Sequence, residues 1–148
     1  MDEVIRTAVA DDLPELQRVF AAAALSNVDD APLLRERPEF LVFAGDGIAE
    51  GRTRVAVRGD RVLGFATVAV VDGRPDLEDL FVDPEYHRRG IARRLIEDAV
   101  ATLKAAGHHQ LTVTGNPHAL EFYRAAGFVE VGRARTELGP APLLRRKL

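Results

Sequence analysis

The residues between Leu80 and Leu95 combine a strand end, a glycine and several arginines, a combination suited to phosphate. A strand pattern ends at Val82, and the clearest helix pattern of the chain begins at Gly90. The first N–H groups of a helix lack partners within it, and the helix dipole adds partial positive charge, so this terminus binds anions. Positive charge is added by four arginines: Arg88, Arg89, Arg93 and Arg94. The sequence favours a phosphate or pyrophosphate site, the alternative being a capped helix with a solvated basic face.

Several other chemistries lack their residues. The sequence has neither the G-x-G-x-x-G dinucleotide fingerprint nor the G-x-x-x-x-G-K-[ST] phosphate loop, which disfavours NAD and nucleoside triphosphates. With no cysteine, the chain has no disulfide, thiolate zinc site or cysteine nucleophile. The adjacent His108 and His109 and the scattered carboxylates do not show metal-ligand spacing, so we expect no metal.

Strand and helix patterns alternate around this junction. The patterns predict strands over 4–9, 52–57, 62–71, 76–82, 110–114 and 128–134, helices over 12–24, 90–106 and 116–126, a broken helix and loop over 29–50, and a final edge strand within 138–148. Asp12 is a suitable N-cap for the first helix, with Glu15 completing a capping box. The β-helix-β unit from Asp76 to Thr114 predicts a right-handed crossover between parallel strands, whereas the hairpins are antiparallel. These elements predict a mixed sheet with helices on its faces.

Two longer motifs overlap these elements. Residues 80–92 read L-F-V-D-P-E-Y-H-R-R-G-I-A, and residues 116–128 read N-P-H-A-L-E-F-Y-R-A-A-G-F. On these motifs the chain resembles the GNAT superfamily of acyl-CoA-dependent N-acyltransferases, whose patterns are L-x-V-x-P-x-[YF]-[QR]-x-x-G-x-[GA] and N-x-x-A-x-x-F-Y-x-x-x-G-F. One departure is His87, which stands where the pattern has Gln or Arg. The resemblance covers nearly the whole chain and implies an α/β (mixed α+β) fold. That fold has a central mixed, mostly antiparallel sheet flanked by helices on both faces, in the order β-α-α-β-β-β-α-β-α-β-β.

The resemblance also implies a role for each motif residue in binding acetyl-CoA, the acetyl-donor cosubstrate. The backbone of Leu80 to Val82 would pair with the pantetheine arm like an added strand, and the Val82 amide would hold the thioester carbonyl. Asn116 would contact the amide region of the cofactor, and Tyr123 would protonate the leaving thiolate. The alternative for Tyr123 is a core aromatic. The implied cofactor-binding residues are Leu80, Phe81, Val82, His87, Arg88, Arg89, Gly90, Ile91, Ala92, Arg93, Asn116 and Tyr123.

The acceptor amine must lose a proton, and a carboxylate is the usual base. Asp76, Glu78 and Asp79 precede the cofactor motif, and we favour Glu78, with an exposed charge on the sheet face as the alternative. Some family members carry an acid just before the Asn, but here no Asp or Glu lies between Lys104 and Glu121. This absence makes a ribosomal-type protein N-terminal acetyltransferase less expected.

The combined prediction is a transferase, an acyltransferase that moves an acetyl group from acetyl-CoA to a primary amine. We expect a small-molecule acceptor that attacks directly in a ternary complex, with residues 24–54 and those after Arg133 setting acceptor specificity. The alternatives are a protein lysine or N-terminal amine as acceptor, or a non-catalytic CoA-binding regulatory domain.

Length and charge bound the remaining expectations. The 148 residues suit a single domain over 1–148, and the net charge of −3 argues against nucleic acid as a partner. No uncharged stretch approaches the ~20 residues of a membrane span, and the first residues do not form a secretory signal. We therefore expect a cytoplasmic protein without a membrane partner. A homodimer paired through the tail strand is possible.

Overall fold

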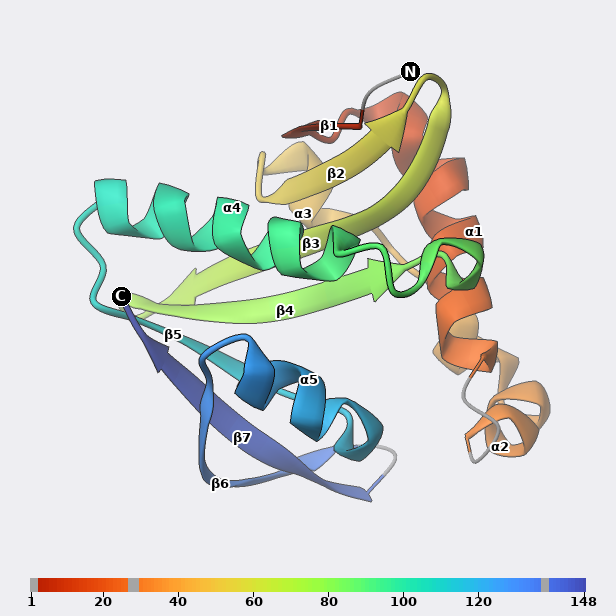
Figure 1. The fold of residues 1–148 in the computed structure, drawn as a ribbon. Helices are drawn as coiled ribbons and strands as arrows, with labels where there is room; N and C mark the ends of the chain where they lie inside the picture. Colours follow the sequence, from red (N-terminus) through yellow and green to blue (C-terminus); the bar gives the residue numbers. More distant parts are fainter. Residues whose placement is uncertain (1–2, 27–29, 137–138) are drawn as a thin grey trace. The chain divides into compact units, whose positions relative to one another are not determined.

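A seven-stranded sheet organises the fold (Figure 1). The computed structural model describes residues 3–26, 30–136 and 139–148. The strands are β1 (Val4–Thr7), β2 (Thr53–Arg58), β3 (Arg61–Val71), β4 (Arg74–Val82), β5 (Gln110–Thr114), β6 (Val129–Thr136) and β7 (Gly139–Lys147). They lie in the order β1-β2-β3-β4-β5-β7-β6.

The helices fall between the strands much as the sequence predicts. They are α1 (Leu13–Leu25), α2 (Ala31–Glu36), α3 (Asp46–Ala49), α4 (Ile91–Ala105) and α5 (Leu120–Ala125), with short 3₁₀ turns η1 (Ala10–Asp12), η2 (Pro38–Leu41), η3 (Pro84–Tyr86) and η4 (Pro117–Ala119). The predicted broken helix corresponds to α2, η2 and α3, although residues 27–29 lie outside the described residues.

The sheet is mixed, as predicted. β1 with β2, β2 with β3, β5 with β7 and β6 with β7 are antiparallel, whereas β4 and β5 are parallel. Two consecutive parallel strands need a crossover connection, and α4 supplies it. The predicted β-helix-β unit is therefore confirmed as a parallel pair.

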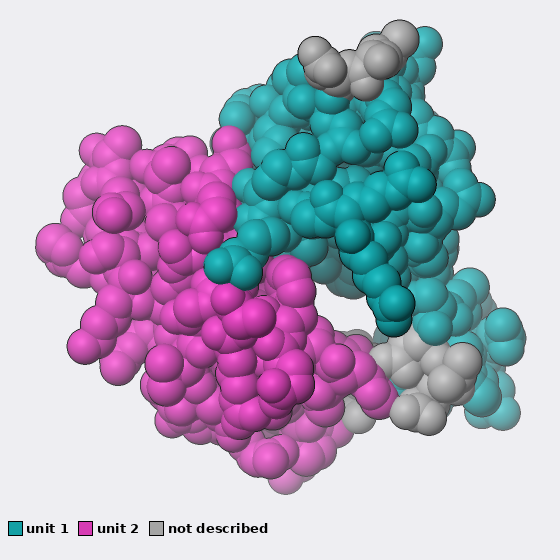
Figure 2. Space-filling view, viewed as in Figure 1, with its two compact units in different colours: residues 1–67, 79–95 teal, residues 68–78, 96–148 magenta. Residues whose placement is uncertain are grey.

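The chain divides into two compact units, shown in teal and magenta in Figure 2. The first contains residues 1–67 and 79–95, and the second contains residues 68–78 and 96–148. The strands β3 and β4 and the helix α4 each contribute residues to both units.

An apolar cluster joins α1 to the sheet in the first unit. Leu16 and Val19 of α1 are fully buried together with Val55 and Phe65 of the sheet. The ring of Phe81, near the end of β4, lies 5.6 Å from that of Phe65. Burial of these side chains removes apolar surface from water and so holds α1 on this face.

The first turn of α4 covers the other face of this part of the sheet. Gly64 precedes Phe65 in β3, so its missing side chain points away from α1. A Cβ on Gly64 would lie 2.9 Å from the Phe81 carbonyl oxygen and 3.3 Å from Ile91, which is 2% exposed. The close approach of the Phe81 carbonyl oxygen, with Ile91 beside it, explains the glycine. Helices on both faces, as predicted, are thus seen in the first unit.

The second unit has its own buried side chains. Leu111 and Val113 of β5, Leu144 of β7 and the aromatic rings of Tyr123 and Phe128 are all buried. The predicted apolar stripe of α4 is also confirmed, because each of its six members is buried: Ile91, Leu95, Ile96, Ala99, Val100 and Leu103.

The tail strand is not at an edge, which corrects the prediction. β7 pairs with β5 on one side and β6 on the other, so β6 is the edge strand. The prolines suggested an edge, since proline lacks the N–H of a ladder. Pro140 and Pro142 fit because the pairing with β5 begins only at Leu143. A dimer through an open β7 edge therefore loses its basis, and residues 137–138 lie outside the described residues.

Two local expectations near the strand ends are also wrong. The carboxylate of Asp12 does not cap α1; it accepts from the Val9 amide at 2.8 Å and pairs with Arg6. Glu15 completes no capping box with Asp12 but pairs with Arg18. The strand predicted over 76–82 begins earlier, because β4 already starts at Arg74.

Candidate functional site

The end of β4 exposes one backbone edge. The Asp83 amide donates a 2.8 Å hydrogen bond to the Leu63 carbonyl of β3. Successive residues of a strand direct their N–H groups to opposite edges, so the Val82 amide points away from β3. On that other edge the parallel register pairs Leu77 with Val113, and β5 ends at Thr114. Within the described residues, the register between β4 and β5 covers Asp76 and Leu77 and does not extend to Val82.

The loop after β4 has an unusual backbone. Asp83 caps η3 by accepting a 3.0 Å hydrogen bond from the Glu85 amide. Arg88 and Gly90 then adopt left-handed conformations, with φ of 64° and 78°. A non-glycine residue in this region is uncommon and costs energy, which marks the loop as a candidate for function. A Cβ on Gly90 would have no atom within 4 Å, so the space above it is open.

The amides that open α4 are available to an anion. The first main-chain hydrogen bond of the helix runs from the Arg94 amide to the Gly90 carbonyl, at 3.0 Å. The preceding amides have no acceptor within the helix, and the dipole makes this end positive. His87, Arg88, Arg89 and Gly90 are all exposed. The predicted phosphate site thus has the local geometry that anion binding requires.

The arginines around this loop do not all point into open solvent. Arg94 forms an ion pair with Glu3. The Arg89 guanidinium lies 5.3 Å from the centre of the Tyr86 ring, and Arg58 lies 5.9 Å from the same ring. Such cation–π contacts hold a guanidinium near an aromatic face while leaving its charge in place.

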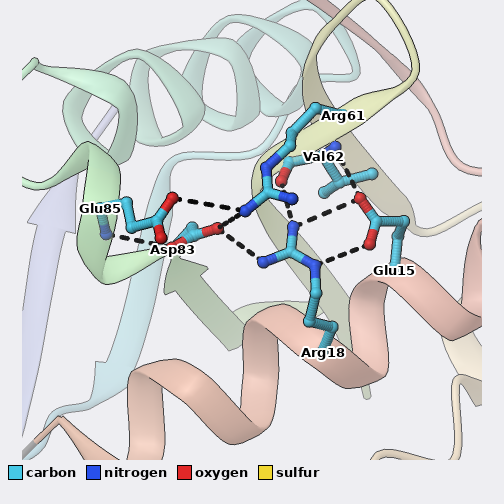
Figure 3. Close-up of polar contacts among 6 residues, drawn as sticks. All are labelled: Glu15, Arg18, Arg61, Val62, Asp83 and Glu85. Carbon is cyan, nitrogen blue, oxygen red and sulfur yellow. Dashed lines mark hydrogen bonds and ion pairs between the residues drawn. The ribbon is translucent and has the colours of Figure 1, made fainter.

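Charged side chains also hold the base of the loop (Figure 3). The Asp83 carboxylate is 3% exposed and lies 2.6 Å from Arg18 of α1 and 3.3 Å from Arg61. Burial alone would raise the pKa of Asp83, but the hydrogen bonds from Arg18 and the Glu85 amide, with the charges of both arginines, lower it. Asp83 is therefore a carboxylate at neutral pH, and the loop begins at a buried ion pair.

In the second unit, the backbone next to Asn116 packs closely against the ring of Tyr123. Asn116 caps η4 by accepting a 2.9 Å hydrogen bond from the His118 amide. A Cβ on the neighbouring Gly115 would lie 3.1 Å from the Tyr123 ring. The glycine thus brings the Asn116 turn against the tyrosine.

The ring of Tyr123 packs as a core aromatic. It is 7% exposed and lies 5.3 Å from Phe122 and 5.5 Å from Phe128, centre to centre. Burial raises the pKa of Tyr123 to about 12. Among the described residues, one side-chain polar atom is buried without a partner, and it belongs to Arg58, not to Tyr123. The structure therefore shows Tyr123 as a core aromatic, whereas the role of its hydroxyl stays a prediction.

The three candidate carboxylates of β4 differ in their surroundings. Asp76 accepts a 2.7 Å hydrogen bond from the Thr112 hydroxyl of β5 and is partly buried. Glu78 is exposed, and Asp79 is partly buried. The bond to Thr112 ties Asp76 to the neighbouring strand β5. The role predicted for Glu78 stays a prediction.

Sequence reasoning missed Arg18 and the second role of Asp83. We took Asp83 only as the residue that ends a strand. The sequence assigned no role to Arg18, which lies on the first predicted helix. A basic residue within one turn of the apolar stripe of that helix was the available signal, but its partner lies 65 residues away. No local pattern connects the two.

Other features are absent from the described part of the chain. Over residues 3–26, 30–136 and 139–148, no group of three or more His, Asp or Glu side chains is arranged to hold a metal ion. The helices of these residues include none long and apolar enough to cross a membrane.

Comparison with known families agrees with the two motifs. Residues 46–140 match the family model described as the acetyltransferase (GNAT) domain. The chain belongs to the GNAT family. The superfamily resemblance drawn from the motifs is therefore confirmed.

Two curated relatives match part of this GNAT chain. N-alpha-acetyltransferase RimI of Mycobacterium tuberculosis is 32% identical over 81 residues, which cover 52% of this chain and 51% of the relative. The ribosomal protein bS18-alanine N-acetyltransferase of Salmonella typhimurium is 34% identical over 74 residues, which cover 48% of this chain and 50% of the relative. The chain spans about half the length of the curated relatives it matches.

A solved structure with the same fold covers the whole chain. The PaiA N-acetyltransferase of Thermoplasma acidophilum, determined in complex with coenzyme A, superposes with a TM-score of 0.76 at 17% identity. The match covers all of both chains. At this identity it establishes the GNAT fold, which agrees with the predicted fold class.

Proposed function

We propose that this protein is an acetyl-CoA-dependent N-acetyltransferase that acetylates a primary amine. The observation that carries the proposal is the junction from β4 to α4. There an outward-facing edge at Val82, a left-handed Gly90 under open space and the amides that precede the first helical hydrogen bond of α4 follow one another within one segment. Membership of the GNAT family supports the same activity.

The residues of this junction fit coenzyme A. The first amides of α4 and those of residues 88–90 would hold the diphosphate, because they lie at a positive helix end. Leu80, Phe81 and Val82 would hold the pantetheine arm through their outward-facing backbone groups. When bound, acetyl-CoA supplies the acetyl group as a thioester. The open space at Gly90 meets the need for close approach of an anion to the backbone.

Tyr123 is proposed to act on the departing sulfur as a hydrogen-bond donor. A phenol with an ordinary pKa near 10 would exchange its proton with a thiolate almost evenly. The buried ring holds its proton more tightly, with a pKa of about 12, whereas a thiol has a pKa of about 8.5. Donation of a hydrogen bond is therefore favoured over complete proton transfer. Asn116 would hold the amide region of the same cofactor, and Glu78 would remove a proton from the amine.

The first candidate acceptor is a small-molecule primary amine, which attacks directly in a ternary complex. Cysteine is absent from the sequence, which favours this direct transfer over a thiol acyl-enzyme. Acceptor specificity is assigned to residues 24–54 and to those after Arg133, which lie outside the two motifs. A cytoplasmic location and a homodimer also stay predictions.

The second candidate acceptor is the N-terminal amine of a protein. It is favoured by the names of the two curated relatives, an N-alpha-acetyltransferase and a ribosomal-protein alanine N-acetyltransferase. A protein lysine is a further acceptor of the same kind. The lack of an acid between Lys104 and Glu121 weighs against this reading only if the base occupies that position.

Release of free thiol from acetyl-CoA tests the activity. The panel pairs small polyamines and amino acids with alanine-starting and lysine-containing peptides. We expect at least one amine to accelerate thiol release, and Tyr123→Phe to lower kcat about 100-fold, as for the loss of one hydrogen-bond donor to a developing anion, while its fold is unchanged. Phenylalanine keeps the ring packing, so it is a control for structure. Tight acetyl-CoA binding without thiol release for any amine would instead support a non-catalytic binding domain.

A pair of substitutions at Gly90 tests where the cofactor binds. Both Gly90→Ala and Gly90→Glu place a Cβ on a left-handed residue, with a similar strain of about 1–2 kcal/mol. Only the glutamate adds a negative charge above the α4 amides. We expect Gly90→Glu to weaken acetyl-CoA binding at least about 100-fold relative to Gly90→Ala, measured by isothermal titration calorimetry. Equal affinities in the two variants would place the diphosphate elsewhere.

A further inference from the structure

The guanidinium of Arg18 joins three segments that are far apart in the sequence (Figure 3). Its Nε donates to Glu15 of α1 at 2.7 Å, and its Nη1 donates to Asp83 at 2.6 Å. Its Nη2 donates to the carbonyl of Val62, in β3, at 3.0 Å. All three nitrogens of the side chain are thus used, which a planar guanidinium does well and an ammonium does not.

Asp83 links Arg18 to the backbone of the loop. Its Oδ2 receives the bond from Arg18, and its Oδ1 accepts from the Glu85 amide at 3.0 Å. Its own amide donates to the Leu63 carbonyl. The Asp83 carboxylate therefore fixes the backbone of the first turn after β4, and Arg18 fixes the position of that carboxylate.

Arg61 also contacts Asp83 but is a weaker restraint. Its contact is longer, 3.3 Å, and its side chain is 43% exposed against 32% for Arg18. It also lies 3.4 Å from the exposed Glu85. Exposed ion pairs are screened by water and contribute little, so Arg18 supplies most of the restraint on Asp83.

The loop between Asp83 and Ile91 is held at its two ends. Ile91 is buried against the Gly64 position at one end, and Asp83 is buried against Arg18 at the other. The residues between them that carry the left-handed backbone are exposed. Their conformation therefore depends on the two anchors rather than on packing of their own.

We infer that Arg18 is a positioning residue for acetyl-CoA: through Asp83 it holds the loop over residues 83–90 in the conformation that presents the amides of residues 88–90 to the diphosphate. This inference rests on the proposed function. Arg18 acts through Asp83 and not on the reacting atoms, so its loss raises the cost of ordering the loop on binding. Its effect therefore falls on cofactor affinity and KM more than on kcat.

The test compares Arg18→Met, Arg18→Lys and wild type as full chains. Methionine keeps most of the aliphatic stem and removes every donor. We expect the Kd for acetyl-CoA to rise about tenfold or more in Arg18→Met, the loss of one charged hydrogen bond, with kcat changed far less. Amide exchange of residues 85–90 in the free protein rises, while that of β2 stays unchanged. Arg18→Lys restores part of the affinity because it keeps the charge but not the three-way contact.

The matched control is Arg124→Met. Arg124 pairs with Glu121 at 2.7 Å with the same three-residue spacing as Arg18 with Glu15, but it is exposed and does not contact Asp83. Its acetyl-CoA affinity should stay within about twofold of wild type, as for an exposed pair. If Arg18→Met does not fold, as judged by circular dichroism, Arg18→Lys carries the comparison.

The outcomes separate the inference from the proposed function. Wild-type protein that does not bind acetyl-CoA would overturn both. Wild-type binding with unchanged affinity and unchanged loop exchange in the Arg18 variants would overturn the inference alone. An equal loss of affinity in Arg124→Met would also overturn it, because the effect would then not depend on Asp83.

Discussion

At the scale of single residues, burial decides which protonation states the chain offers for chemistry. Tyr123 and Asp83 are both buried, yet their pKa values move in opposite directions. Tyr123 has no charged partner that offsets burial, so its pKa rises. Asp83 has Arg18 and Arg61 beside it, so its pKa falls despite burial. One group therefore holds a proton firmly, and the other holds a charge firmly, at neutral pH.

The raised pKa of Tyr123 predicts an alkaline titration. Its folded-state pKa of about 12 exceeds its ordinary value of 10, so its contribution to stability is present below pH 10 and is lost as pH rises through about 12. The chain has two tyrosines, so Tyr86→Phe leaves Tyr123 as the only one. We expect the absorbance of this variant at 295 nm to titrate with a midpoint near 12. A midpoint near 10 would mean that the hydroxyl is well solvated.

At the scale of elements, local patterns placed α4 correctly, but they could not place β7. The stripe of α4 is a property of consecutive residues, and burial of all its members confirms it. Whether a strand is central or at an edge depends on which partners reach it. For β7 these are β5 and β6, and its prolines fit because they lie beyond the pairing with β5. Proline content alone therefore led to the wrong position.

The contact of β3 with the end of β4 and with α4 predicts the cost of one added methyl group. A Cβ on Gly64 would approach the Phe81 carbonyl oxygen to 2.9 Å and Val82 to 3.1 Å. We expect Gly64→Ala to lower the free energy of unfolding by about 1–3 kcal/mol, as for overpacking, measured by urea unfolding. It should also weaken acetyl-CoA binding, because the displaced atoms belong to the cofactor segment.

The control for this prediction is Gly132→Ala in the edge strand β6. A Cβ there would meet no atom within 4 Å, so the change in stability should be about 0.5 kcal/mol or less. Equal losses in the two alanine variants would show that the cost does not arise from the contact of Gly64 with β4.

At the scale of the whole molecule, residues of both compact units carry parts of the motifs. The first unit holds the cofactor loop, and the second holds Glu78, Asn116 and Tyr123. The strands β3 and β4 contribute to both units, as does α4. The single domain expected over 1–148 stays a prediction.

Ligand selectivity provides a prediction for the whole chain. A ligand that binds only the folded protein stabilises it by about 2.7 kcal/mol at 100 times its Kd. For a chain of this size we expect acetyl-CoA and coenzyme A to raise the Tm by about 5–10 °C, followed by differential scanning fluorimetry. ATP and NAD, which share the diphosphate but lack the pantetheine arm, should shift it much less. Equal shifts with all four ligands would indicate a general phosphate-ester binder.

The sequence by itself determined the features that depend on neighbouring residues. The GNAT motifs, the start of α4 next to Gly90, the cap at Asn116 and the hairpin of β2 and β3 are local, because hydrogen bonding and steric preference act over a few residues. The fold class followed from the motifs and the order of these elements. The assignments of Glu78 and Tyr123 to catalysis are predictions of the same origin.

Only the tertiary structure decided the contacts between distant segments. The pairing of Arg18 with Asp83, the interior place of β7 and the burial that raises the pKa of Tyr123 depend on residues far apart in the chain. Such contacts form when the sheet and its helices exclude water together. A run of neighbouring residues therefore does not determine which distant residue will contact it. The anchor of the cofactor loop is therefore visible only in the folded protein.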